Sequence, residues 1–237
     1  MSDSLVIIPT FNEKENVERI IRKVFSLTPA FHVLIVDDGS PDGTAAIVKQ
    51  LMTDFPDRLF LQERKGKLGL GTAYIHGFKW ALARSYYFIF EMDCDFSHDP
   101  DDLLRLRQAC LDGADVAIGS RYMKGGRIQN WPISRILMSY FASVYVRTVL
   151  WININDTTAG FKCYKRRVLE RINFESIKFI GYAFQIEMKY IAYKLGFKLV
   201  EVPITFKDRT EGASKMSKGI FKEAIIGVLK MRFMKIS

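Results

Sequence analysis

The sequence has few cysteines and histidines, and it lacks the short motifs of several enzyme classes. Its three cysteines (Cys94, Cys110 and Cys163) are odd in number and include no C-x-x-C pair. This usage argues for a reducing compartment and against structural zinc. The three histidines form no cluster that would suit a metallohydrolase. Neither the G-x-S-x-G of serine hydrolases nor the G-x-x-x-x-G-K-[ST] of P-loop ATPases occurs.

Long apolar runs are also missing. The longest stretch without charge or break covers residues 136–146, eleven residues, whereas a spanning helix needs about 20. The N-terminus has no basic segment followed by an apolar one, so no signal peptide is expected. The sequence therefore predicts a protein that does not cross a membrane, although it can lie on one.

The composition is that of a globular protein with an uneven excess of positive charge. Of the 237 residues, 49% are hydrophobic and 26% are charged, which suits one large α/β domain. The net charge is +9, and residues 205–237 carry eight Lys and Arg against three Asp and Glu. A cationic tail suits anionic lipid, nucleic acid or a phosphorylated substrate, and composition alone does not choose among them.

Apolar strands alternate with amphipathic helices along the first half of the chain. Strands are expected at 5–8 (ending at Pro9), 31–36, 59–62, 86–92, 115–122 and 197–202. Helices are expected from Asn12 onward and at 44–52, 72–83, 133–151 and 220–233. This order predicts a mostly parallel sheet flanked by helices, which binds ligands at the carboxyl ends of its strands.

The most informative stretch is the strand 86–92, which runs into Asp93-Cys94-Asp95. Six acids lie between Glu91 and Asp102, although the protein is basic overall. Residues 97–102 can be explained as the acidic start of a helix, but Asp93 and Asp95 precede that turn. Their oxygen ligands suit Mg²⁺ or Mn²⁺, which commonly share their coordination with phosphate.

Polar segments follow three of the predicted strands, and we expect them to meet at one edge of the sheet. They are Pro9-Thr10-Phe11-Asn12-Glu13, Asp37-Asp38 and Asp93-Cys94-Asp95. The Gly69-Leu70-Gly71 segment lacks the third glycine of a dinucleotide fingerprint and is interpreted as a loop that enters a helix. Phosphate oxygens could be held by basic residues, with Arg121, Arg135, Arg209 and Lys215 as the candidates.

Taken together, these motifs resemble the family 2 inverting glycosyltransferases, which have a Rossmann-like GT-A fold. The resemblance rests first on residues 6–13 and 35–44. Residues 67–74, 92–98, 119–122, 156–162 and Arg209-x-x-x-Gly212-x-Ser214-Lys215 make it similar to the dolichyl-phosphate (polyprenyl-phosphate) mannosyltransferases. It covers about residues 5–220.

The resemblance implies GDP-mannose as donor and a polyprenyl (dolichyl) monophosphate as acceptor. By it, the guanosine would be seated by Pro9, Phe11, Glu13, Val36 and Asp38. The metal, Mg²⁺ or Mn²⁺, and the diphosphate would be bound by Asp93 and Asp95, with backbone contacts from Cys94. Ser97 stands where many relatives have Gln as a further metal ligand.

On the same basis, the phosphates of donor and acceptor would be bound by Arg121, Arg209 and Lys215. Together with Asp95, these three are the residues expected to be catalytic. Phe11 stands where the family often has Tyr, so stacking on a base is retained and a hydroxyl contact is lost.

The expected organisation is a catalytic domain at 1–216 and a basic amphipathic C-terminal helix at 217–237. The C-terminal helix is interpreted as an interfacial helix on a membrane, at its cytoplasmic face. The helix at 133–151 could either cover a core or lie in the interface. Some members of the family rely on small membrane partner subunits, so such a subunit is one partner that the resemblance implies.

Two alternatives stay open. One is the same architecture with UDP-glucose as donor, since base and sugar selection depend on few contacts. The other is a non-catalytic binder of anionic lipid or nucleic acid. The acidic edge, and the lack of a stripe in which basic and aromatic residues alternate, argue against nucleic acid.

Overall fold

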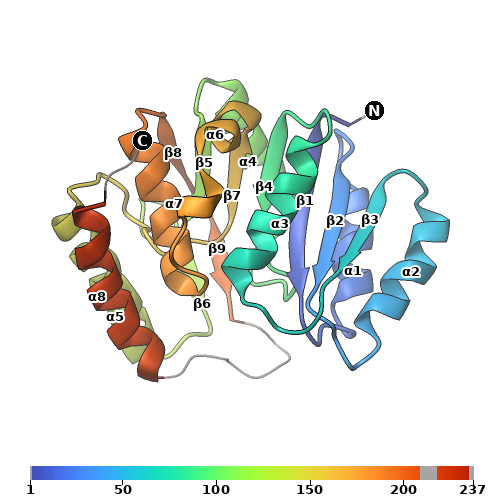
Figure 1. Cartoon of the computed structure of the whole chain (residues 1–237), viewed down its shortest axis with the longest axis horizontal. Helices are drawn as coiled ribbons and strands as arrows, with labels where there is room; N and C mark the ends of the chain where they lie inside the picture. The colour runs from blue at the N-terminus through green and yellow to red at the C-terminus, as the bar shows by residue number, and fades with distance from the viewer. Residues whose placement is uncertain (1, 209–217, 235–237) are drawn as a thin grey trace.

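The computed structural model describes residues 2–208 and 218–234, which form a seven-stranded sheet with helices on both faces (Figure 1). The first half of the chain forms β1 (Ser4–Thr10), α1 (Val17–Phe25), β2 (His32–Asp37), α2 (Thr44–Asp54), β3 (Leu59–Glu63), α3 (Leu70–Leu82), β4 (Phe88–Glu91), α4 (Asp102–Leu111) and β5 (Val116–Ser120). The second half forms β6 (Arg127–Gln129), α5 (Ile133–Leu150), β7 (Lys162–Lys165), α6 (Arg166–Arg171), a short 3₁₀ helix (Phe174–Ser176), α7 (Tyr182–Lys194), β8 (Leu199–Pro203), β9 (Thr205–Lys207) and α8 (Lys218–Arg232). The predicted alternation of strands and helices is confirmed.

The sheet is mostly parallel, as the sequence predicts. Its strand order is β3-β2-β1-β4-β7-β5-β8. The exception is β7, which the sequence did not predict and which runs antiparallel to both β4 and β5. A separate two-stranded parallel sheet is formed by β6 and β9. Because β7 is reversed, its first residue lies at the same edge as the carboxyl ends of the parallel strands.

Alternate side chains of the strands enter two apolar layers, one on each face of the sheet. In β1, Leu5 and Ile7 belong to the layer covered by α3, α5, α6 and α7, whereas Val6 and Ile8 belong to the layer covered by α1, α2 and α4. All four side chains are fully buried. This period of two fixes the strand register, since a slip by one residue would move each side chain to the opposite face.

Two local predictions around β1 are wrong. The strand does not end at Pro9 but continues to Thr10, with Pro9 opposite Val36. Beyond Ile7, β1 pairs with β2 alone, and a residue without an N–H is tolerated there. Asn12 does not begin a helix either: it adopts a left-handed φ of 59°, and α1 starts at Val17, five residues after it and directly after Asn16.

Helices α5 and α8 lie side by side at one end of the molecule (Figure 1). The Tyr145 hydroxyl donates a hydrogen bond to the carbonyl of Ile225 at 3.0 Å. The carboxyl-terminal half of α5 is buried at Val146 and Leu150, so it covers a core. Large apolar side chains that are 44–75% exposed extend over the rest of the pair, namely Ile133, Leu137, Met138, Tyr140 and Phe141 of α5 and Ile225, Ile226 and Leu229 of α8.

Within residues 2–208 and 218–234, no helix combines the length and the hydropathy needed to cross a bilayer. The predicted C-terminal helix is present as α8. The boundary expected at residues 216 and 217 lies outside the described residues.

Candidate active site

The carboxyl edge of the sheet, which is the lower edge in Figure 1, collects most of the predicted site. Phe11 and Glu13 follow β1, Asp38 follows β2, and the segment Asp93–Ser97 follows β4. Arg121 follows β5 directly. The predicted convergence of these segments on one edge is therefore what the fold produces. Arg209 and Lys215 lie outside the described residues.

The loops after β1 and β2 are tied together by short hydrogen bonds. The backbone N–H groups of Asn12, Glu13 and Lys14 donate to Ser40 Oγ, Thr44 Oγ1 and Asp42 Oδ2 at 3.0, 3.0 and 3.1 Å. Val36 is fully buried in β2 opposite Pro9, and its side chain belongs to the apolar layer covered by α3, α5, α6 and α7. The result is a stable platform on which Phe11 can present its ring to a planar base.

Asp38 is held by two residues that the sequence analysis did not select. Arg64 Nε donates to Asp38 Oδ1 at 2.7 Å, and the backbone N–H of Leu68 donates to Asp38 Oδ2 at 3.2 Å. Both ion-pair side chains are more than nine-tenths buried. In the same loop, Lys67 Nζ lies 5.2 Å from the centre of the Phe11 ring. The segment after β3 thus closes the side of the edge that β1 and β2 form, and its position after a predicted strand was the available signal.

The turn after β4 presents two carboxylates of different exposure. Asp95 is nearly buried and accepts a hydrogen bond from the backbone N–H of Ser97 at 3.0 Å. Phe96, which lies between Asp95 and Ser97, has a left-handed φ of 57°, which produces the tight turn. The Asp93 side chain is 38% exposed, and the Tyr74 hydroxyl lies 3.5 Å from its Oδ1. The turn therefore offers carboxylate oxygen atoms from two residues, two positions apart, at the open edge of the sheet.

These residues fit a hard divalent cation that shares its shell with a ligand. Among the side chains that the structure describes, no group of three or more His, Cys, Asp and Glu could enclose a metal. Two carboxylates, Asp93 and Asp95, with Ser97 buried beside them, match a site that Mg²⁺ or Mn²⁺ completes with water and phosphate oxygens. The Cys94 side chain is buried in the apolar layer covered by α1, α2 and α4, and this burial raises the pKa of its thiol well above the ordinary value.

His98 lies beneath this turn and is a packing residue. Its ring stacks on Phe161 with centroids 4.8 Å apart and meets the edge of Phe206. Burial lowers the pKa of His98 to about 4, although the negative charge of Asp95 opposes the shift. His98 is therefore neutral at physiological pH, and its ring contacts give it a structural role beneath the turn.

Arg121 is bound tightly by Asp156. Its Nε and Nη2 donate to the two carboxylate oxygens of Asp156, each at 2.7 Å, and Nη2 also donates to Thr158 Oγ1 at 2.8 Å. Asp156 is fully buried, and the Arg121 side chain is 8% exposed. The neighbouring guanidinium lowers the pKa of Asp156 against the effect of burial, so the carboxylate is ionised.

Aromatic rings and a second arginine surround this ion pair. The guanidinium of Arg121 lies 5.2–5.6 Å from the ring centres of Tyr122, Trp131 and Phe206. Arg135, the fourth basic candidate, lies 4.0 Å from the centre of the Trp131 ring and pairs with Asp208 at 3.0 Å. The two arginines thus flank one tryptophan, between the buried edge and the exposed start of α5.

A fully buried ion pair lies at the end of β4, two residues before the acidic turn. Lys162 Nζ is 3.1 Å from Glu91 Oε2, and both side chains have no exposed surface. Glu91 also accepts hydrogen bonds from Gln185 Nε2 at 2.7 Å and from the Tyr164 hydroxyl at 3.0 Å, and Lys162 donates to the Gln185 amide oxygen. Lys162 thus balances the buried charge of Glu91, and it is close enough to the turn for the negative charge of Asp93 to raise its pKa against the effect of burial. Sequence reasoning did not find this pair.

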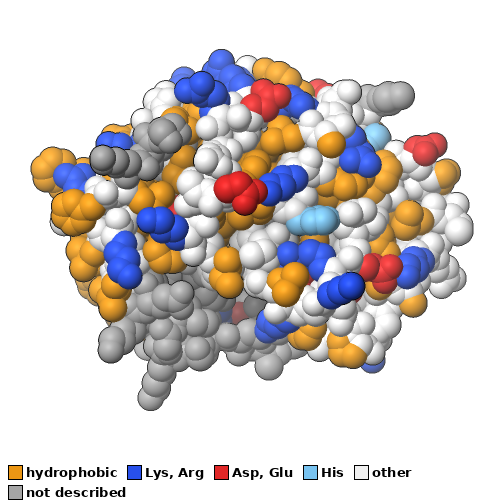
Figure 2. Space-filling view, viewed as in Figure 1, with side chains coloured by type: hydrophobic (Ala, Val, Ile, Leu, Met, Phe, Trp, Pro, Cys, Tyr) orange, Lys and Arg blue, Asp and Glu red, His pale blue; other side chains and the backbone are white. Residues whose placement is uncertain are grey.

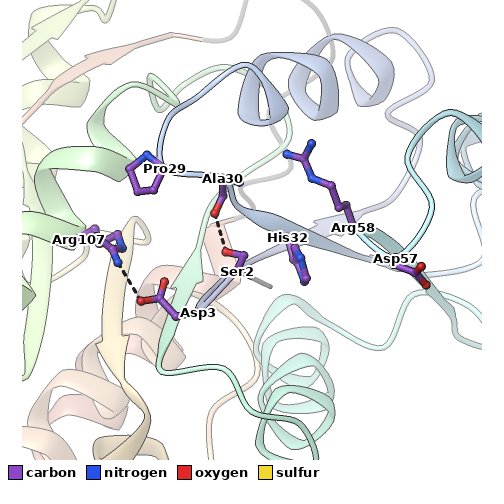
Figure 3. A pocket seen from close by; sticks show the side chains of 8 residues that line it. All are labelled: Ser2, Asp3, Pro29, Ala30, His32, Asp57, Arg58 and Arg107. Carbon is purple, nitrogen blue, oxygen red and sulfur yellow. Dashed lines mark hydrogen bonds and ion pairs between the residues drawn. The ribbon is translucent and has the colours of Figure 1, made fainter.

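A cavity of about 650 Å³ lies at the opposite, amino-terminal edge of the sheet (Figure 3). Its Arg107 already pairs with Asp3 at 2.8 Å, and its Ser2 hydroxyl donates to the carbonyl of Ala30. None of the predicted site residues lines it. The cavity is therefore separate from the candidate site.

A mostly parallel sheet flanked by helices, with an Asp-x-Asp turn at its carboxyl edge, is the arrangement of the GT-A glycosyltransferases. The profile described as "Glycosyl transferase family 2" matches residues 5–172, and the chain belongs to this family.

Two curated relatives match nearly the whole chain. The polyprenol monophosphomannose synthase of Mycolicibacterium smegmatis is 48% identical over 225 residues, which cover 95% of this chain and 85% of that protein. The undecaprenyl-phosphate mannosyltransferase of Micrococcus luteus is 43% identical over 226 residues, which cover 95% and 92%.

Among solved structures, glucosyl-3-phosphoglycerate synthase from Mycobacterium tuberculosis, in complex with Mn²⁺, UDP and glucosyl-3-phosphoglycerate, superimposes with a TM-score of 0.71. It is 16% identical, and the match covers 98% of this chain and 81% of that one. This likeness shows the GT-A fold.

Proposed function

We propose that the protein transfers mannose from GDP-mannose to a polyprenyl (dolichyl) monophosphate with inversion at the anomeric carbon. The observation that carries the proposal is the arrangement of the carboxyl edge, where Phe11 and Asp38 lie on one side of the Asp93–Asp95 turn and Arg121 on the other. The names of the two curated relatives support the sugar and the class of acceptor.

The donor would occupy the side formed by β1, β2 and the loop after β3. Pro9, Phe11, Glu13, Val36 and Asp38 would seat the guanosine. Lys67 lies over the Phe11 ring, so binding of the base would move this flexible side chain from the stacking face. Arg64 would keep the Asp38 carboxylate in place for the base, since the two form a buried ion pair.

The diphosphate would reach the acidic turn together with a divalent cation, Mg²⁺ or Mn²⁺, held by Asp93, Asp95 and Ser97. When bound, the cation offsets the negative charge that develops on the departing GDP. Cys94 would contribute its backbone. The third protein ligand is the weakest, because a serine side chain reaches less far than the glutamine that many relatives carry.

The acceptor phosphate would be bound by Arg121, Arg209 and Lys215, with Arg135 at the entrance. A phosphate monoester oxygen is already ionised at neutral pH, so the neutral, buried His98 is not needed as a base. In a single displacement, this oxygen forms the bond to the anomeric carbon while the bond to GDP breaks and its electron pair leaves with GDP. Basic side chains fixed before the reaction stabilise that charge distribution.

A first test is transfer of radiolabelled mannose from GDP-mannose to a short polyprenyl phosphate in detergent. We expect organic-extractable label with Mg²⁺ or Mn²⁺, and loss of at least about 100-fold with chelator, because the cation supplies several kcal/mol of charge stabilisation. Competition between GDP and UDP for binding tests which nucleobase the site prefers. Preferential binding of UDP would exclude the GDP-mannose assignment and favour the UDP-glucose alternative.

We also propose that the protein is a peripheral enzyme on the cytoplasmic face of a membrane, and the α5–α8 pair supports this proposal. The exposed apolar side chains of both helices lie at one end of the molecule, with Lys and Arg among them (Figure 2). Between Asp115 and Asp156 the sequence contains no acid and five cations. Such a surface suits an interface with anionic headgroups, where the lipid acceptor is found.

Vesicle binding tests this surface. We expect the double variant Leu137→Glu, Phe141→Glu to lose roughly tenfold or more in affinity for anionic vesicles, since each buried apolar side chain contributes about 1.5–3 kcal/mol. Leu111→Glu on α4 is the matched control, because Leu111 is also half-exposed but belongs to the other face of the sheet. Equal loss in both variants, measured by co-sedimentation, would contradict the assignment to α5.

A further inference from the structure

The segment from Asp156 to Lys162 connects the two halves of the candidate site, and the proposed function leaves it without a role. Asp156 and Thr158 contact Arg121, whereas Phe161 stacks on His98 beneath the acidic turn. Lys162 ends the segment in the buried pair with Glu91. The segment reaches all of these partners because β7 enters the sheet from the carboxyl edge, between β4 and β5.

Among the residues that the structure describes, the hydrogen-bond partners of Arg121 leave one side-chain nitrogen, Nη1, for a ligand. A guanidinium has five N–H groups. The single N–H of Nε and one N–H of Nη2 are given to Asp156, and the second N–H of Nη2 is given to Thr158. Two N–H groups on Nη1 therefore remain, and the three aromatic neighbours hold the plane of the group.

Hydrogen bonds from other elements hold the backbone at Asp156 and three residues beyond it. Glu201 accepts hydrogen bonds from the backbone N–H groups of Asn155 and Asp156, both at 2.8 Å. Three residues further on, the fully buried Lys189 of α7 donates to the carbonyl of Ala159 at 2.6 Å. The carboxylate therefore has little freedom to follow Arg121 if that side chain moves.

We propose that Asp156 is a positioning residue for the transfer reaction, which holds one edge of the Arg121 guanidinium and thereby directs Nη1 toward the acceptor phosphate. This inference rests on the proposed function, because it assigns the phosphate to Arg121. A guanidinium that is fixed before the substrate arrives loses no rotational freedom on binding and needs no reorientation during the reaction. Asp156 touches neither substrate in this role.

The test compares Asp156→Asn with Thr158→Val, which removes one neutral partner of Arg121 and keeps the shape of the side chain. We expect Asp156→Asn to lower kcat for mannose transfer roughly 10- to 100-fold, in the range found when a supporting partner of a functional group is removed. Thr158→Val should lower it about threefold, and GDP affinity should stay within about twofold in both.

Asp115→Asn is the matched control. Asp115 is also nearly buried and accepts hydrogen bonds from Arg167, but it lies at the amino end of β5 and Arg121 at the carboxyl end. We expect wild-type kcat in this variant. If all three variants lost activity only in proportion to their loss of folded protein, the role of Asp156 would be structural and the inference wrong.

A double-mutant cycle with Arg121→Lys separates positioning from stability. If Asp156 acts through Arg121, Asp156→Asn should lower kcat by less than about twofold once Arg121 is replaced. If the double variant lost kcat by the product of the two single-variant factors, the two residues would act independently and the inference would be wrong. The Arg121 Nε–H proton, assigned by NMR from its loss in Arg121→Lys, should exchange slowly in the wild type and rapidly in Asp156→Asn.

The NMR measurement does not depend on the donor or acceptor. Rapid exchange in the wild type would show that the ion pair does not hold Arg121 in solution, which would overturn the inference. A slowly exchanging Arg121 in a protein that transfers no mannose would instead contradict the proposed function.

Discussion

Replacing Asp95 with alanine is expected to abolish transfer while the protein stays folded. Asp95 lies in the turn that would hold the cation, so its loss should cost about 4 kcal/mol or more of transition-state stabilisation, about 10³-fold in rate. Folding should persist because the substitution removes one of three carboxylates near the end of β4. The lost hydrogen bond to the Ser97 N–H costs only about 1 kcal/mol.

Transfer and thermal unfolding should be measured on the same samples, with Asp101→Ala as control. Asp101 belongs to the same acidic stretch, but its side chain is 58% exposed and pairs with Lys23. Mn²⁺ with GDP should raise the Tm of the wild type and of Asp101→Ala, because a ligand that binds only the folded state stabilises it, and should leave the Tm of Asp95→Ala unchanged. Retained turnover in Asp95→Ala would show that the metal lies elsewhere.

The sequence predicted which loops meet at the carboxyl edge of the sheet, because that prediction depends only on local strand and turn patterns. Parallel strands place their carboxyl ends together whatever their order in the sheet, so Phe11, Asp38 and Asp93 were expected to converge before any pairing was known. The structure confirms this convergence. The start of α2 at Thr44 was likewise predicted from the turn residues that precede it.

The features that the sequence did not predict, which are strand β7 and the buried ion pairs, depend on partners distant in the sequence. The four residues of β7, Lys162-Cys163-Tyr164-Lys165, have a charge at each end and look like a surface segment. They form a buried strand because Glu91, 71 positions earlier, accepts the charge of Lys162. Similarly, the partner of Arg64 is Asp38, and only the assembled edge shows that this arginine is buried. Local periodicity contains no information about such pairs.

Lys162 places a buried positive charge among the acids at the end of β4. Acids at the end of a strand need positive charge nearby, and the fold supplies it from Lys162, which is fully buried next to Glu91. Burial lowers the pKa of Lys162, and the negative charge of Glu91 opposes that shift. A charge in such a place is stable only while its partner remains.

Lys162→Met is therefore expected to cause the largest loss of stability among the variants considered. It leaves Glu91 buried without its counter-charge, and breaking one partner of a buried ion pair typically costs about 3–5 kcal/mol. For a chain of this size the Tm should fall by roughly 10 °C. The exposed pair Lys79–Glu175 provides the control, since Lys79→Met breaks an ion pair whose side chains are 54% and 79% exposed, and should cost less than about 1 kcal/mol.

The double variant Lys162→Met, Glu91→Gln distinguishes charge from packing. With both charges removed, Tyr164 and Gln185 can still donate or accept hydrogen bonds at position 91, so most of the lost stability should return. Urea unfolding of the three variants measures these differences as free energies. If the double variant were as unstable as Lys162→Met alone, the cost would come from the shape of the lysine side chain, and Lys162 would fill space beneath the site instead of balancing its charge.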